Sequence, residues 1–304
     1  MKNLKILAVA VLATGLFSCK KEMGKSPVKE LDEGTVTNAT AACQPGYYNL
    51  ALDNVGKSYV YKVSGSPSAG PVVVSPIIGS NGDNIVGSSS PLTTVFKMTG
   101  LSYDPTTGTA WGLTGNAGNF PNSLIKFSIG DPNVVGIVSL TTACGINLDL
   151  SDIERDPTTG RYYAINRGTA NPDNRIVVID ITTGIVNCLP NFIPVPTALR
   201  GLTFGCNGQL YVLNAVNTTG KVLQINKATG AIIGSWAYPG VITPGGVGAP
   251  EMGLHFDCSC INQFITGSFT GGPLLTDGLP AGLGGPLYNS LLGVIKPTVD
   301  FARP

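Results

Sequence analysis

Histidine is almost missing from this sequence: 304 residues contain only His255. A histidine-rich metal site is therefore excluded, and a Ser-His-Asp triad would have to use this one imidazole. The sequence also has no G-x-S-x-G elbow, phosphate-binding loop, H-E-x-x-H pair or EF-hand loop. The enzyme classes that depend on these motifs are disfavoured.

Charge is scarce as well. Only 12% of the residues are charged and the formal net charge is +1. Binding to nucleic acid draws much of its free energy from basic side chains that neutralise phosphates, and no basic stripe is present. We expect no nucleic-acid partner.

No apolar run is long enough to cross a bilayer, which takes about 20 residues in a helix. The longest candidate runs from Ile6 to Phe17, after Lys2 and Lys5, and stops at Cys19. A short basic region followed by an apolar stretch of this length is typical of a signal peptide. We therefore expect residues 1–18 to be removed on export.

The end of this stretch, Leu16-Phe17-Ser18-Cys19, resembles the lipobox of bacterial lipoproteins, although Phe17 is bulkier than the usual residue there. The resemblance implies a diacylglyceryl thioether and an amide-linked chain on Cys19, enough acyl chains for stable membrane attachment. The next residue is Lys20 rather than Asp, which disfavours inner-membrane retention. We expect an outer-membrane lipoprotein; whether it faces the periplasm or the exterior stays open.

Six cysteines remain once Cys19 carries lipid. An even number in an exported chain permits disulfides, but sequence alone cannot choose among the possible pairings. Cys258 and Cys260 could suggest a metal clip, yet two thiolates with one histidine make a poor zinc site. The candidate disulfide cysteines are Cys43, Cys144, Cys188, Cys206, Cys258 and Cys260.

Glycine and proline are abundant, at 40 and 22 residues, and 43% of the chain is hydrophobic. This composition favours many short strands joined by tight turns. Residues 19–42 are polar without an apolar period and indicate a flexible, lipidated tether. Residues 43–304 are expected to form one all-β domain.

An internal repeat organises that domain. Equivalent leucine or isoleucine residues recur about every 50 residues, which indicates stacked supersecondary units. Each lies in a hairpin of alternating apolar residues, and two of the hairpins turn at Asp-Pro-Thr-Thr-Gly, where proline fixes φ and glycine takes a positive φ. The equivalent residues are Leu101, Ile153, Leu202 and Leu254.

A second hairpin follows the first in three of these units, within residues 122–128, 175–186 and 221–233. Residues 47–52, 58–63 and 71–74 predict three strands of an incomplete first unit that lacks an innermost strand of its own. Four antiparallel strands in each of about five units predict a β-propeller. Six blades or another β-repeat fold, such as a β-helix, are the alternatives.

The repeat resembles the blades of quinoprotein-like, YVTN-type and NHL-type propellers over roughly residues 47–304. The shared residues are turn and core positions, as in Asp156-Pro157-Thr158-Thr159-Gly160 followed by Tyr162-Tyr163. The resemblance therefore implies the fold and leaves the function open.

Propellers bind ligands at a mouth of the central channel, where the innermost strands and the loops before them present side chains. Equivalent positions there define the candidate site, with no catalytic role assigned to any of them. The candidate channel-mouth residues are Lys97, Asp152, Glu154, Arg200, Glu251 and His255.

Calcium is the one cofactor that these residues raise. Asp152-Ile153-Glu154 resembles the Asp-x-Glu-Gly segment of calcium-dependent phosphoesterase-like propellers, but Arg155 replaces the glycine. Calcium takes six to eight oxygen ligands, so the neighbouring cations Lys97 and Arg200 oppose it. We therefore predict no metal or cofactor, and an arrangement in which these charges pair with one another.

Two long Gly/Pro-rich stretches, 238–253 and 267–286, are expected to be loops. Loops of this length are often functional. The leucines of the second stretch fit either a partner-binding or lid role, or packing across the propeller face.

Three functions remain, one of which is a purely structural role in the envelope. The favoured one is a non-catalytic propeller that binds a protein or glycan of the envelope or exterior, held to the membrane by the N-terminal lipid. The alternative is a metal-dependent hydrolase, lactonase or lyase acting through Asp152, Glu154 and Glu251 at the channel mouth. The enzyme requires these carboxylates to converge.

Overall fold

In the computed structural model, the residues described below all belong to the second of two compact units, Thr37–Pro304. The predicted signal peptide, Cys19 and the predicted tether lie outside the described residues. The structure describes residues 47–52, 58–64, 73–76, 96–116, 120–128, 134–167, 174–194, 199–205, 208–216, 219–238, 254–256, 263–266, 275–278, 285–286 and 298–302.

The described residues are all-β, with no helix among them, and form five sheets of four antiparallel strands. One sheet gains a short fifth strand that runs parallel to its neighbour. The first sheet contains β21 (Thr298–Ala302), β1 (Tyr47–Leu52), β2 (Ser58–Ser64) and β3 (Val73–Pro76). The second contains β4 (Met98–Asp104), β5 (Thr109–Thr114), β6 (Ser123–Ser128) and β7 (Val134–Ser139). The third contains β9 (Leu150–Arg155), β10 (Tyr162–Asn166), β11 (Arg175–Ile179), β12 (Ile185–Phe192) and β8 (Thr141–Thr142). The fourth contains β13 (Leu199–Phe204), β14 (Leu210–Val216), β15 (Thr219–Ile225) and β16 (Ile232–Tyr238). The fifth contains β17 (Leu254–Phe256), β18 (Gln263–Thr266), β19 (Leu275–Gly278) and β20 (Gly285–Pro286).

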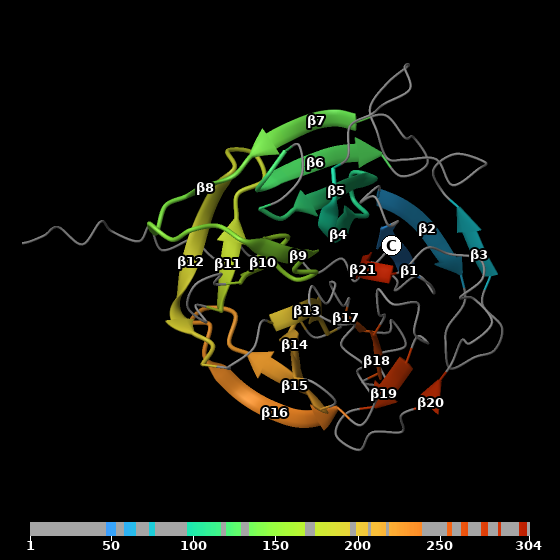
Figure 1. Ribbon diagram of the computed structural model, residues 1–304, viewed down its shortest axis with the longest axis vertical. Coiled ribbons are helices and arrows are strands. Elements are labelled where there is room, and N and C mark those ends of the chain that lie inside the picture. The colour runs from blue at the N-terminus through green and yellow to red at the C-terminus, as the bar shows by residue number, and fades with distance from the viewer. Residues whose placement is uncertain are drawn as a thin grey trace, which may run out of the picture. The chain divides into compact units, whose positions relative to one another are not determined.

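The innermost strand of each sheet contacts the innermost strands of two other sheets. Strand β4 contacts β21 and β9, β13 contacts β9 and β17, and β17 contacts β21. Figure 1 shows these strands nearest the centre and β7, β12 and β16 farther out. This is the blade arrangement of a β-propeller, so the predicted fold class is confirmed.

The repeat predicted the hairpins correctly. The strands around Leu101, Ile153, Leu202 and Leu254 are the first and second strands of their sheets. The stretch 267–286 was expected to be a loop, but it contains β19 and β20, which complete the fifth sheet. The sequence did not predict these short strands because the stretch is rich in glycine and proline, which are depleted in strands generally.

The first sheet takes its innermost strand from the C-terminal end of the described chain. Strand β21 pairs antiparallel with β1, with Tyr48 opposite Ala302 and Leu50 opposite Asp300. The strand missing from the first repeat therefore comes from residues 298–302. Pairing of distant segments in one sheet fastens the first blade to the last strand of the chain.

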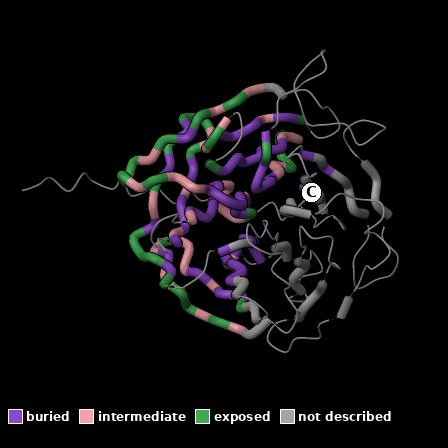
Figure 2. The backbone as a smooth tube through the Cα atoms, viewed as in Figure 1, coloured by how far each residue is buried: buried purple, intermediate pink, exposed green. Residues whose placement is uncertain are grey.

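The hydrophobic core lies between neighbouring sheets. Leu50 of the first sheet packs in one cluster with Leu101 and Phe127 of the second. Corresponding clusters join the second sheet to the third and the third to the fourth. In these sheets Figure 2 shows buried residues along the inner strands and exposed residues along the outer ones. Each fully buried leucine, isoleucine or phenylalanine stabilises the fold by roughly 1.5–3 kcal/mol.

Candidate functional site

Each of three innermost strands is interrupted by a β-bulge near its start. The pairing register shifts between Met98 and Gly100 in β4, between Ser151 and Ile153 in β9, and between Leu199 and Leu202 in β13. A bulge leaves an extra residue unpaired and redirects its side chain. The repeated bulge therefore places particular side chains between neighbouring inner strands.

Two of these side chains connect one sheet to the next. The Thr99 hydroxyl donates a hydrogen bond to the carbonyl oxygen of Leu150, at 3.2 Å. Oδ2 of Asp152 accepts a hydrogen bond from the backbone N–H of Leu202. Asp152 has a φ of +56°, a conformation that aspartate tolerates better than most residues. Asp152 is therefore buried, at 2% exposure, and joins the third sheet to the fourth.

Glu154 occupies a repeated buried polar position on the innermost strands. Its equivalents are Ser102 and Thr203, and all three side chains are less than 5% exposed. Each lies opposite an aromatic residue of the second strand, which is Tyr163 in the case of Glu154. Both Asp152 and Glu154 have further interactions beyond these, so neither carboxylate is free.

The other predicted channel-mouth residues are less fully described. Lys97 is exposed and precedes β4 with a φ of +52°. Arg200 lies in the bulge of β13, and His255 lies in β17 opposite Ile265; for both, only the backbone is described. Glu251 lies outside the described residues.

The Asp-Pro-Thr-Thr-Gly segments are hairpin turns, as the sequence predicted. In the first turn Oδ1 of Asp104 accepts a hydrogen bond from the Thr106 N–H at 3.0 Å, and the Gly108 N–H bonds to the Asp104 carbonyl. The same two bonds recur at Asp156, Asp180 and Asn226. All four closing glycines have a positive φ, from +67° to +80°.

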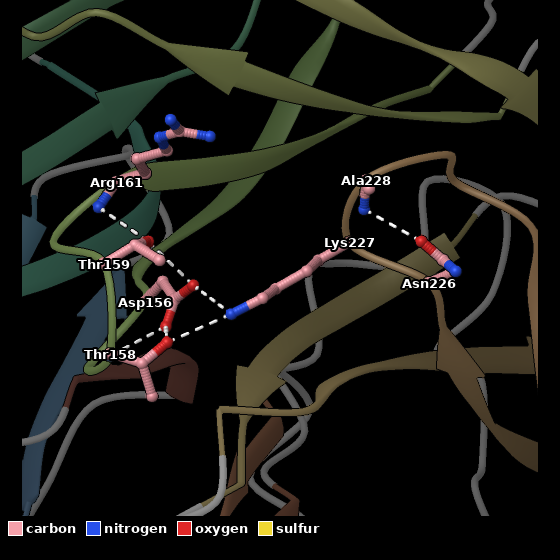
Figure 3. Close-up of polar contacts among 7 residues, drawn as sticks. All are labelled: Asp156, Thr158, Thr159, Arg161, Asn226, Lys227 and Ala228. Atoms are coloured by element: carbon pink, nitrogen blue, oxygen red, sulfur yellow. Dashed lines mark hydrogen bonds and ion pairs between the residues drawn. The ribbon is translucent and has the colours of Figure 1, made fainter. Parts of the chain in front are cut away.

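Two ion pairs at these turns were not predicted from the sequence. Arg155 Nε lies 3.5 Å from Oδ1 of Asp104, which links the second and third sheets. Lys227 Nζ lies 2.7 Å from Oδ2 of Asp156, which links the third and fourth, and it also bonds to the Thr158 hydroxyl. Figure 3 shows Lys227 reaching across to Asp156 and Thr158. The only sequence signal was a charged residue beside each turn.

Both paired carboxyls are held ionised. Burial alone would raise the pKa of Asp156, but hydrogen bonds from Lys227 and Thr158 outweigh it and lower that pKa. Burial likewise opposes ionisation of Asp104, and hydrogen bonds from Thr106 with the Arg155 charge lower its pKa. These acids therefore stabilise turns and link sheets, and their carboxylate oxygens already accept hydrogen bonds or form ion pairs.

Cys144 and Cys188 form a disulfide, the one cysteine pair within the described residues. The other four candidate cysteines lie outside that part of the chain. Among the described side chains, no group of three or more His, Cys, Asp or Glu residues could hold a metal ion. Within the same residues, no helix is long and apolar enough to span a bilayer.

Comparison with known proteins adds no family: no protein-family model matches the chain, and no curated protein matches it. Among solved structures, the chain is similar to one in a nidogen/laminin complex, with a TM-score of 0.48, 14% identity and 84% of each chain covered. Virginiamycin B lyase from Staphylococcus aureus has a TM-score of 0.42 and 15% identity, with 79% of this chain and 69% of that chain covered. The Swd1 β-propeller domain of Myceliophteria thermophila has a TM-score of 0.42 and 16% identity, with 76% of this chain and 65% of that chain covered.

Proposed function

We propose that this chain is an exported lipoprotein whose propeller binds a protein or glycan of the cell envelope or exterior and catalyses no reaction. The observation that carries this choice is that acids which the enzyme would need already have structural partners. Of the acids named for the hydrolase, Asp152 is buried and joins two innermost strands, and Glu154 is buried and has a partner of its own. A metal-dependent hydrolase requires carboxylate oxygens that point together at an ion.

The disulfide supports an extracytoplasmic location. Disulfides persist mainly in oxidising compartments, and Cys144 is solvent-exposed, where cytosolic reductants would reach it. The lipobox-like segment ending at Cys19 supplies the anchor, and the absence of Asp after Cys19 favours the outer membrane.

The anchor is tested on the full chain expressed in a diderm bacterium. Mass spectrometry of the mature N-terminus is expected to find Cys19 as the first residue, with the mass of the attached acyl chains. Cys19→Ser is the matched variant and is expected to leave the chain uncut. An N-terminus elsewhere, or an unlipidated Cys19, would reject the anchor. Protease treatment of intact cells then decides between the periplasmic and the external leaflet.

The binding role is tested by thermal melting of the detergent-solubilised full chain. A ligand that binds only the folded state raises its stability by RT ln(1+[L]/Kd). We expect envelope glycans or an envelope protein to raise the melting temperature, and chelator to leave it unchanged. A melt that chelator lowers and calcium restores would instead support the metal-dependent hydrolase.

A further inference from the structure

The chain between the second and third sheets runs along the outer edge of the third sheet. We call residues 141–144 the strap; they follow Leu140, which is buried in the core. Within it β8 pairs parallel with β12, with Thr141 opposite Ile185 and Thr142 opposite Val186. The Thr141 N–H donates to the Gly184 carbonyl and the Ala143 N–H to the Val186 carbonyl, both at 2.9 Å. Figure 1 shows β8 outside β12.

The strap covers the outer edge of β12, which would otherwise expose backbone groups beside hydrophobic side chains. Strand β12 carries two exposed large hydrophobic side chains, Ile185 at 41% and Phe192 at 50% exposure. An apolar edge strand with open backbone groups is a template for pairing with another chain. Within the described residues, β12 is the only outer strand that gains a further strand, since β7 and β16 end their sheets.

Noncovalent contacts hold the strap weakly. Thr141, Ala143 and Cys144 are exposed, so little apolar surface is buried beneath them. Two backbone hydrogen bonds give a small net stabilisation in water, whereas ordering each residue of the strap costs backbone entropy. The disulfide between Cys144 and Cys188 must therefore hold the strap against β12.

That bond is open to thiol chemistry. Cys144 is exposed and Cys188 is half-buried in β12. A thiolate of a dithiol attacks Sγ of Cys144, forms a mixed disulfide and displaces the Cys188 thiolate, which takes up a proton. The second thiol of the reductant then displaces the Cys144 thiolate, which is protonated in turn. The dithiol is oxidised to its disulfide, and two electrons and two protons pass to the protein.

We infer that the Cys144–Cys188 disulfide is a redox-operated lock on the outer edge of β12. In the oxidised protein the strap covers the carbonyls of Gly184 and Val186. Reduction releases the strap and opens that edge while the inner strands of the same sheet stay paired. The inference rests on the strap geometry and is independent of the proposed ligand and of the anchor.

Hydrogen–deuterium exchange on the full chain tests the lock, with the double variant Cys144→Ser/Cys188→Ser compared with the oxidised wild type. Exchange at the Thr141 and Ala143 amides is expected to accelerate at least tenfold, with β10 and β11 unchanged. Adding dithiothreitol to the wild type should reproduce this change, and adding it to the double variant should change the strap no further. The last comparison separates this disulfide from the other cysteines.

Two results would overturn the lock. Unchanged strap exchange, in the double variant or in the reduced wild type, would mean that hydrogen bonding alone holds the strap. Loss of protection throughout β10 and β11 would mean that the disulfide supports the whole sheet. Reduction of the folded wild type keeps the test decisive if the double variant does not fold.

Discussion

The Lys227 ammonium lies 2.7 Å from Oδ2 of Asp156, a carboxylate whose side chain has no exposed surface. The two residues belong to turns of neighbouring sheets, 71 positions apart in the chain. A buried carboxylate needs a partner, and here the partner arrives from the next blade. Turns that look purely local in the sequence therefore also hold blades together.

Replacing this lysine should destabilise the fold. Lys227→Met removes the charge and leaves Asp156 with only its threonine donors. We expect the free energy of unfolding to fall by about 1–3 kcal/mol, a modest loss because Lys227 is one-third exposed and partly screened by water. Urea unfolding measures it. Lys221→Met is the matched control, because Lys221 is exposed on β15 and should cost less than about 0.5 kcal/mol. Equal losses in the two variants would contradict the pairing.

Stability should fall in acid through Asp156. Its pKa is lowered in the folded state, because the Lys227 and Thr158 hydrogen bonds outweigh burial, whereas an unfolded aspartate titrates near pH 3.9. Its contribution is therefore fully present above about pH 4 and is lost as pH falls through the folded pKa. Asp156→Asn should flatten this acid limb of the unfolding free energy, measured by urea titration from about pH 6 to about pH 2. Asp180→Asn, at the same turn position but exposed, should flatten it less. An Asp156→Asn profile parallel to the wild type would refute the assignment.

Asp152 should behave as a structural acceptor. Asp152→Asn keeps an oxygen for the Leu202 N–H and tolerates the positive φ, so we expect stability close to that of the wild type. Asp152→Gly keeps the conformation but loses the acceptor, and should cost about 1–3 kcal/mol. Thermal melts of both variants, together with ligand binding, measure the difference. Loss of binding or activity in a fully stable Asp152→Asn variant would point to a direct functional role.

Two turn glycines should differ in their tolerance of alanine. Gly108 and Gly184 both have a positive φ, so Cβ strain of about 1 kcal/mol applies to each. A Cβ at Gly108 meets nothing within 4 Å, whereas one at Gly184 would lie 2.3 Å from the Ser139 carbonyl oxygen. Gly184→Ala should therefore cost about 3 kcal/mol, against about 1 for Gly108→Ala. Chemical unfolding of the two variants compares them, and similar losses would show that the chain next to β8 can move aside.

The candidate site was only partly predictable. Asp152 and Glu154 were chosen because they lie on an innermost strand, and that strand is β9. The alternation of apolar residues did not predict the bulge at Asp152. The apolar pattern resumes at Ile153, so nothing in it reveals the extra residue. The bulge turns this carboxylate toward Leu202 of the next sheet.

The sequence alone was enough to predict the repeated hairpins and their turns, although it did not predict β19 and β20. Their causes are local: apolar alternation selects strands, and Asp-x-x-Thr-Gly closes a turn with bonds that span only a few residues. Tertiary structure alone decided that residues 298–302 complete the first sheet, that Lys227 pairs with Asp156, and that Cys144 bonds to Cys188. Each of these joins segments dozens to hundreds of residues apart. Such partners are chosen by the packing of whole blades, which no local pattern records.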